Sequence, residues 1–188
     1  ERARRSAFQF IFGGGLRTKD EHDPVNPVKP VPDHPYLHVM VELMLLGSKF
    51  LEPSKAIRAL GAGLPLDFLE LIYRTGILFV EKSRDMFITN IISAFIHWRA
   101  KFRAYQLILV QSKNEEDAAN LVYNKESDKA RISFQEFHLP EHLRTADLRK
   151  AGSYGRLSCP NGSHIRGIAQ GGHIIRSEHP SMIFSDEA

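Results

Sequence analysis

The residues His138-Leu139-Pro140-Glu141-His142 form the clearest chemical motif in the sequence. They fit the H-x-x-E-H pattern, in which two histidines bind zinc and the glutamate acts as the base of a peptidase. That chemistry needs both histidines on one helical face. Pro140 is tolerated only in the first turn of a helix, so His138 would precede the helix. His138, Glu141 and His142 are thus the candidate ligands of an alternative, a metal-dependent hydrolase, and the favoured prediction has no metal.

A basic stripe with an aromatic neighbour is the second feature that could bind a ligand. Trp98, Arg99, Lys101 and Arg103 follow one another within six residues. Basic side chains beside aromatic ones suit the headgroups of an anionic membrane. They also suit the backbone and bases of RNA. A solvated helix face without a ligand is the third interpretation, because charge runs are usually solvated faces.

The sequence shows no motif that predicts catalysis or a cofactor. Gly61-Ala62-Gly63 lacks the third glycine of a dinucleotide fingerprint, and Gly13-Gly14-Gly15 is not followed by the Lys-Ser/Thr of a phosphate loop. The single cysteine, Cys159, precedes a proline and has no helix start to activate it. We therefore predict a protein that is not an enzyme and holds no cofactor.

Length and composition predict one globular core. The chain has 188 residues, of which 43% are hydrophobic and 25% are charged, and its formal net charge is +3. These values are ordinary for a folded domain and exclude a disordered or fibrous chain. One cysteine excludes an internal disulfide scaffold and favours a reducing compartment.

Residues 1–33 are expected to form an extended arm rich in proline and glycine. Four prolines, at positions 24, 27, 30 and 32, favour extended backbone and remove hydrogen-bond donors. Such an arm keeps a fixed course only against another surface, so Phe8, Phe10 and Phe12 are predicted to contact a partner. The Arg-rich, acid-poor start resembles the remnant of a mitochondrial presequence. The alternative is that the chain is cut from a longer one.

Residues 34–150 are expected to form a helical core domain of about five to six helices, with one long central helix. Capping residues, prolines and glycines set the boundaries of most of them. The predicted helices are Pro35–Leu46, Pro53–Leu60, Pro65–Thr75, Arg84–Lys113 with Ser83 as its cap, a helix from Asn114 to about Asn124, and one from Pro140 to about Lys150. Residues 133–139 alternate as in a short strand. For residues 77–83 the sequence does not distinguish a helix from a strand.

Residues 151–188 are expected to form a second irregular arm. Its glycines interrupt short apolar pieces, and one hairpin with Gln170-Gly171-Gly172 as its turn is predicted. The apolar residues Met182, Ile183 and Phe184 near the end are predicted partner contacts. The predicted fold class is therefore mainly α, with a small helical core flanked by two arms.

No transmembrane span is expected. The least interrupted apolar run, Met86–Trp98, is shorter than the about 20 residues that a spanning helix needs. Basic residues follow it directly, and each is costly within a bilayer.

Taken together, these features predict a non-catalytic accessory subunit of a large mitochondrial membrane assembly, of the respiratory-chain or ATP-synthase type, associated with the inner membrane. Its expected partners are other protein subunits and anionic lipid. An alternative is a mitochondrial ribosomal protein that contacts RNA, which the acidic residues of the first arm disfavour.

Overall fold

The computed structural model describes residues 6–20, 23–81, 87–124, 130–145, 152–171 and 178–186. The chain divides into two compact units. Unit 1 combines residues 1–31 with residues 96–188, and unit 2 consists of residues 32–95. Helix α6 (Ile88–Phe102) begins in unit 2 and ends in unit 1.

Unit 2 is helical in its described part. Apart from the start of α6, its elements are α3 (Pro35–Gly47), η1 (Pro53–Lys55), α4 (Ile57–Gly61) and α5 (Leu66–Thr75). Helix α3 packs against both α4 and α5. The buried carboxylate of Glu42 in α3 accepts hydrogen bonds from the Ala59 amide at 2.8 Å and from Arg58 Nη1 at 3.2 Å. Helix α5 ends where Gly76 adopts a φ of 70°, a conformation that glycine reaches without strain.

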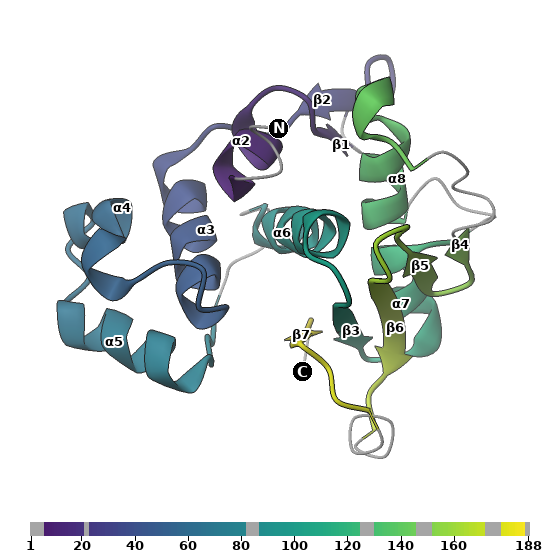
Figure 1. The fold of residues 1–188 in the computed structure, drawn as a ribbon. Coiled ribbons are helices and arrows are strands. Elements are labelled where there is room, and N and C mark those ends of the chain that lie inside the picture. Colours follow the sequence, from purple (N-terminus) through teal and green to yellow (C-terminus); the bar gives the residue numbers. More distant parts are fainter. Residues whose placement is uncertain are drawn as a thin grey trace. The chain divides into compact units, whose positions relative to one another are not determined.

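Unit 1 contains a mixed five-stranded sheet in the order β4-β5-β6-β3-β7. Its strands are β3 (Leu107–Ser112), β4 (Gly152–Ser153), β5 (Arg156–Ser158), β6 (His164–Ala169) and β7 (Met182–Ser185). Strand β3 is parallel to both of its neighbours, β6 and β7, whereas β4, β5 and β6 pair in antiparallel fashion. Figure 1 shows β3 between β7 and β6.

Helices and a small hairpin complete the described part of unit 1. They are α2 (Ala7–Phe12), β1 (Arg17–Lys19), β2 (Val28–Pro30), the end of α6, α7 (Glu115–Val122), α8 (Arg131–Phe137) and η2 (Glu141–Leu143). Helix α7 packs on β6 and β3 and also on α8. The approach to β6 is close, because a Cβ atom on Gly167 would lie 2.8 Å from the carbonyl oxygen of Ala118. Asn114 caps α7 by accepting a hydrogen bond from the Asp117 amide at 2.8 Å.

The predicted fold class is wrong, because the protein is mixed α/β and not mainly α. Of the described residues, 45% are helical and 17% lie in strands. The residues expected to form the first arm contain α2 and the β1–β2 hairpin. Those expected to form the second arm supply β4, β5, β6 and β7. The glycines taken as signs of irregular backbone instead sit at turns and at close approaches between elements.

Several boundaries also differ from prediction. The long helix ends at Phe102, and its expected last part is strand β3. Residues 133–139 lie mostly in helix α8 rather than in a strand. Residues 76–81 belong to neither a helix nor a strand. Three predictions fall at least partly on residues that the structure does not describe. They are the cap at Ser83, the last part of the helix predicted from Pro140 to about Lys150, and the second half of the hairpin with Gln170-Gly171-Gly172 as its turn.

The predicted helices at Pro35, Pro65 and Asn114 are confirmed as α3, α5 and α7, and the helix expected from Pro53 is present as two short pieces, η1 and α4. Among the described residues, no helix combines the length and the apolar character that crossing a membrane requires.

Candidate functional site

The three parallel strands of unit 1 end at one level. Ser112 at the end of β3 pairs with Ala169 at the end of β6, and Gln111 pairs with Ser185 at the end of β7. Backbone hydrogen bonding to β3 continues one residue beyond the end of β7 and one residue beyond the end of β6. The Asp186 amide donates to the Gln111 carbonyl at 2.9 Å, and the Gln170 amide donates to the Ser112 carbonyl at 2.9 Å. We call this row of strand ends the carboxyl edge.

Ser112 and Asp186 lie on the same face of the sheet at the carboxyl edge. Val110 pairs with Phe184, and Ser112 and Asp186 each follow two residues later. Asp186 lies one residue beyond β7, but its amide keeps the ladder hydrogen bond to the Gln111 carbonyl, so the alternation of a strand brings it to the face of Ser112. Val110 also pairs with Gly167, which approaches α7, so this is the face that α7 covers. The residues between them face the other way, where Ser185 Oγ lies 3.3 Å from Gln111 Oε1.

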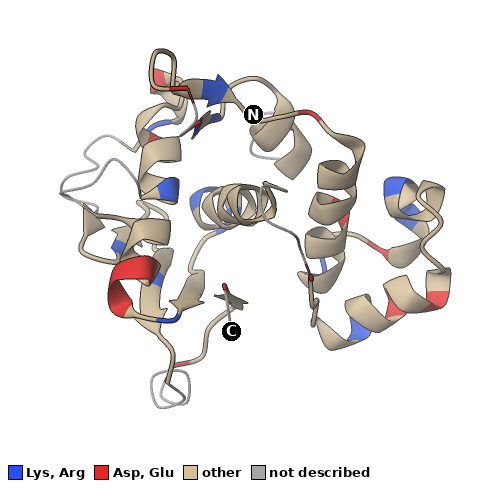
Figure 2. Ribbon diagram, turned by 180° about the vertical axis from the view of Figure 1, so that it is seen from behind, with Lys and Arg blue, Asp and Glu red and all other residues tan. Residues whose placement is uncertain are grey.

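The charges around the carboxyl edge are mixed. Lys113 follows Ser112 directly and is exposed, and its Nζ lies 3.4 Å from Asp117 Oδ2. The first turn of α7 carries Glu115, Glu116 and Asp117, and these acidic residues stand out in Figure 2. A helix amino terminus normally favours anions because it is the positive end of the helix dipole. Here the three carboxylates already interact with that positive end. A phosphate would therefore reach this edge best when a cation accompanies it.

The donor chemistry of the edge fits a hard divalent cation. Carboxylate and hydroxyl oxygens are the ligands that Mg²⁺ prefers, and Mg²⁺ typically takes one or two protein carboxylates and fills its remaining positions with water and substrate phosphates. Asp186 is half-buried and supplies a carboxylate, and Ser112 on the adjacent strand supplies a hydroxyl from a side chain that is only 4% exposed. A site of this kind does not need a cluster of three acidic or histidine side chains.

His138, Glu141 and His142, the candidate ligands of the alternative metal site, do not form a cluster. His138 caps α8, and its Nδ1 lies 2.9 Å from the carbonyl oxygen of Phe134. Glu141 and His142 are exposed in η2. Within the part of the chain that the structure describes, no group of three or more His, Cys, Asp and Glu side chains is placed to hold a metal ion.

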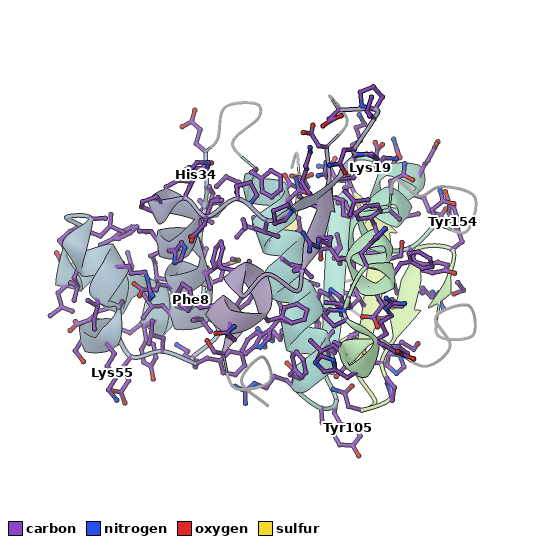
Figure 3. All side chains as sticks on the ribbon, turned by 90° about the horizontal axis from the view of Figure 1, so that it is seen from above. Phe8, Lys19, His34, Lys55, Tyr105 and Tyr154 are labelled. Carbon is purple, nitrogen blue, oxygen red and sulfur yellow. The ribbon has the colours of Figure 1, made fainter. Side chains whose placement is uncertain are left out.

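The structure places most of the predicted basic stripe inside unit 1. Trp98 and Arg99 are 1% and 7% exposed. Lys101 Nζ lies 2.8 Å from Glu136 Oε1, and the guanidinium of Arg103 lies 5.4 Å from the centre of the Trp98 ring. All four side chains thus make contacts within the unit. By contrast, Tyr105 after the helix is 85% exposed and projects away from the ribbon (Figure 3).

The aromatic residues predicted as partner contacts divide between core and surface. Phe10 is buried, with its ring edge-on to His97 and Phe102 at 5.3 and 5.5 Å. Phe8 and Phe12 are half-buried and stack on each other at 6.2 Å (Figure 3 labels Phe8). The other three, Met182, Ile183 and Phe184, lie in β7, and Ile183 is 44% exposed.

A buried ionic cluster joins α8 to the end of α6. Glu136 Oε2 lies 2.5 Å from His97 Nε2, and its carboxylate also accepts from Lys101 and from the Thr145 amide. Burial alone would raise the pKa of Glu136, but the hydrogen bond and charge of His97 and the charge of Lys101 hold it well below its usual value. Burial raises the pKa of nearby Cys159 to about 11, with Lys101 opposing and Glu136 adding to the shift. This thiol is therefore unreactive at neutral pH.

Comparison with known proteins adds no identification. No family model matches this sequence, and no curated protein matches it either. We therefore infer function from the geometry of the site itself.

Sequence reasoning did not single out Ser112 or Asp186. The available indication was a run of apolar residues, Met182-Ile183-Phe184, followed by Ser185 and then by the acidic pair Asp186-Glu187. In P-loop nucleotide hydrolases, a Walker-B aspartate helps to hold the magnesium ion. That pattern became informative only when β7 was found parallel to β3.

Proposed function

We propose that unit 1 binds the magnesium complex of a nucleoside triphosphate at the carboxyl edge, and that the protein is a nucleotide hydrolase. The observation that carries the proposal is the position of Asp186 and Ser112 on one face at the ends of two adjacent parallel strands. In open α/β sheets, ligands bind outside the carboxyl ends of the parallel strands. This proposal departs from the predicted non-catalytic subunit, which was inferred without β3 and β7.

Each residue at the edge has a stated part in the proposal. Asp186 would hold the cation, as the aspartate after an apolar strand does in P-loop nucleotide hydrolases, and the Ser112 hydroxyl would be a second oxygen ligand. Lys113, whose ion pair with Asp117 is exposed and long, is available to turn toward the phosphates.

The test is a titration of the full chain with a fluorescent adenosine or guanosine triphosphate, with and without Mg²⁺. We expect Mg²⁺-dependent binding that the Asp186→Asn variant weakens at least about tenfold, since losing even an indirect support of a metal ligand costs that much. The matched control is Glu116→Gln, which removes one exposed charge in the first turn of α7. Binding that ignores Mg²⁺, or an Asp186→Asn variant with the affinity of the unaltered protein, would contradict the proposal.

A second candidate is the predicted accessory subunit of a mitochondrial membrane assembly. It is favoured by the apolar residues that unit 2 leaves exposed, namely Leu66, Phe68 and Leu71 on α5 and Ile77 and Phe79 after it. Exposed apolar groups of this size mark surfaces that bind other proteins. Native-gel fractionation of mildly solubilised mitochondria would place the chain with a respiratory or ATP-synthase complex, with ribosomal particles, or with neither.

A further inference from the structure

Arg99 lies at the amino ends of the same strands whose carboxyl ends form the proposed site. Its Nε donates to Gln106 Oε1 at 3.0 Å, and its Nη2 donates to the Ser181 carbonyl at 2.9 Å. Gln106 is the residue before β3, and Ser181 is the residue before β7. One guanidinium therefore holds the starts of two adjacent parallel strands.

The third parallel strand joins the same network through Gln106. The Gln106 carbonyl accepts from the amide of His164, the first residue of β6, at 2.7 Å. The backbone amide of Gln106 in turn donates to Ser163 Oγ at 3.0 Å. Ser181 is also fixed on β3, because both its amide and its hydroxyl donate to the Leu107 carbonyl, at 2.8 and 3.0 Å. The starts of β6, β3 and β7 are thereby aligned with one another.

The burial of Arg99 indicates that this network is more than a surface contact. The residue is 7% exposed, and burial, followed by the nearby charge of Arg103, lowers the pKa of its guanidinium. A buried cation is retained only where its hydrogen bonds are well made, because its desolvation is costly. A planar guanidinium with donors in fixed directions suits two acceptors on neighbouring strands better than a flexible ammonium does.

The register of β7 on β3 decides whether the proposed site exists. A slip of one residue would turn every β7 side chain to the opposite face of the sheet. Asp186 would then leave the face that carries Ser112. Strand β7 is short and lies at the edge of the described sheet, so its side chains alone specify its register weakly.

We propose that Arg99 is a positioning residue of the carboxyl edge, which fixes the register of β7 on β3 and so brings Asp186 beside Ser112. This inference rests on the proposed function for its consequence in nucleotide binding. Its structural part, the register, is testable without a nucleotide.

The first experiment measures amide hydrogen exchange by NMR in Arg99→Gln and Arg99→Lys. The amide of Asp186 reports the β7–β3 ladder, and the amide of Gln170 reports the β6–β3 ladder. We expect Arg99→Gln to accelerate exchange at Asp186 at least tenfold more than at Gln170. Arg99→Lys should restore part of the protection, because an ammonium keeps one bond to Ser181. Arg103→Gln, which removes an equal charge from the residue directly after α6, should leave both amides unchanged.

The second experiment measures the affinity of the same variants for Mg²⁺ and a fluorescent nucleoside triphosphate. Affinity should fall in Arg99→Gln, recover in part in Arg99→Lys and stay unaltered in Arg103→Gln. Equal acceleration at Asp186 and Gln170, or no acceleration at all, would overturn the positioning role. If Arg99→Gln does not fold, the comparison of the two amides in Arg99→Lys decides instead. A protein that binds no nucleotide but shows the selective exchange would refute only the proposed function.

Discussion

Glu136 is a buried side chain with several partners in unit 1. Its carboxylate accepts hydrogen bonds from an imidazole, an ammonium and a backbone amide, and only 3% of its side chain is exposed. The cluster is not fully satisfied, because His97 Nδ1 is buried with no hydrogen-bond partner among the described residues. A buried polar atom of this kind costs free energy. The carboxylate therefore has to offset both its own desolvation and that of its neighbours.

Replacement of Glu136 by glutamine is expected to lower the free energy of unfolding by about 3 kcal/mol, because breaking a buried ion pair leaves the partner charges uncompensated. Urea denaturation followed by circular dichroism measures this loss. Glu141→Gln is the control, since Glu141 is exposed in η2 and its replacement should change stability by less than about 0.5 kcal/mol. If Glu136→Gln lowered the free energy of unfolding no more than Glu141→Gln does, the ionic cluster would add no stability.

At the scale of single elements, β3 explains why the fold class was mispredicted. Leu107-Ile108-Leu109-Val110 is a continuous apolar run, as expected of a parallel strand buried on both faces, and it lacks the alternation that marks a half-buried strand. Directly after a helix, such a run extends the helical pattern without a visible break. Helices with clear caps, such as α7 after Asn114, were found because their signals are local. The strands of residues 152–185 were missed because only their partners far along the chain define them.

The contact between β6 and α7 leads to a prediction about Gly167. Alanine at this position would place a Cβ atom 2.8 Å from a backbone oxygen of α7, so either the helix or the strand must move. We expect Gly167→Ala to destabilise the protein by about 1 to 3 kcal/mol, as overpacking does. Gly15→Ala is the matched control, because its Cβ atom would meet Pro140 at an ordinary 3.4 Å. Thermal unfolding of the two variants measures the difference, and equal midpoints would refute the close approach.

At the scale of the whole molecule, the candidate site is a product of topology. Ser112 and Asp186 are 74 residues apart in sequence, and only the parallel arrangement of β3 and β7 brings them to one face. Neither residue belongs to a short motif that spacing alone would reveal. The H-x-x-E-H motif at residues 138–142 lies at the end of α8 and in the 3-10 helix η2. This backbone does not bring the side chains of the motif together.

The stability of the whole protein should fall in acid because of Glu136. Its pKa is depressed in the folded state, so its contribution is complete above the ordinary value of 4.5 and is lost as the pH falls below it. The urea midpoint should therefore decrease between about pH 5 and about pH 3. In Glu136→Gln the decrease over this window should be smaller, since the titrating group is absent. If the urea midpoints of the two proteins decreased equally over this pH window, the acid sensitivity would come from other carboxylates.

The end of helix α6 has a consequence for how the chain is made. Asn161 Nδ2 donates to the carbonyls of Ala100, Lys101 and Arg103, which are about 60 residues earlier in the chain. The strands that flank β3 also come later, from His164 onward. At roughly 5 to 20 residues per second, a ribosome needs several seconds to supply them. During that interval the nascent chain exposes an apolar segment, residues 107–110, with nothing to pair it, so this stretch is where a chaperone would be needed.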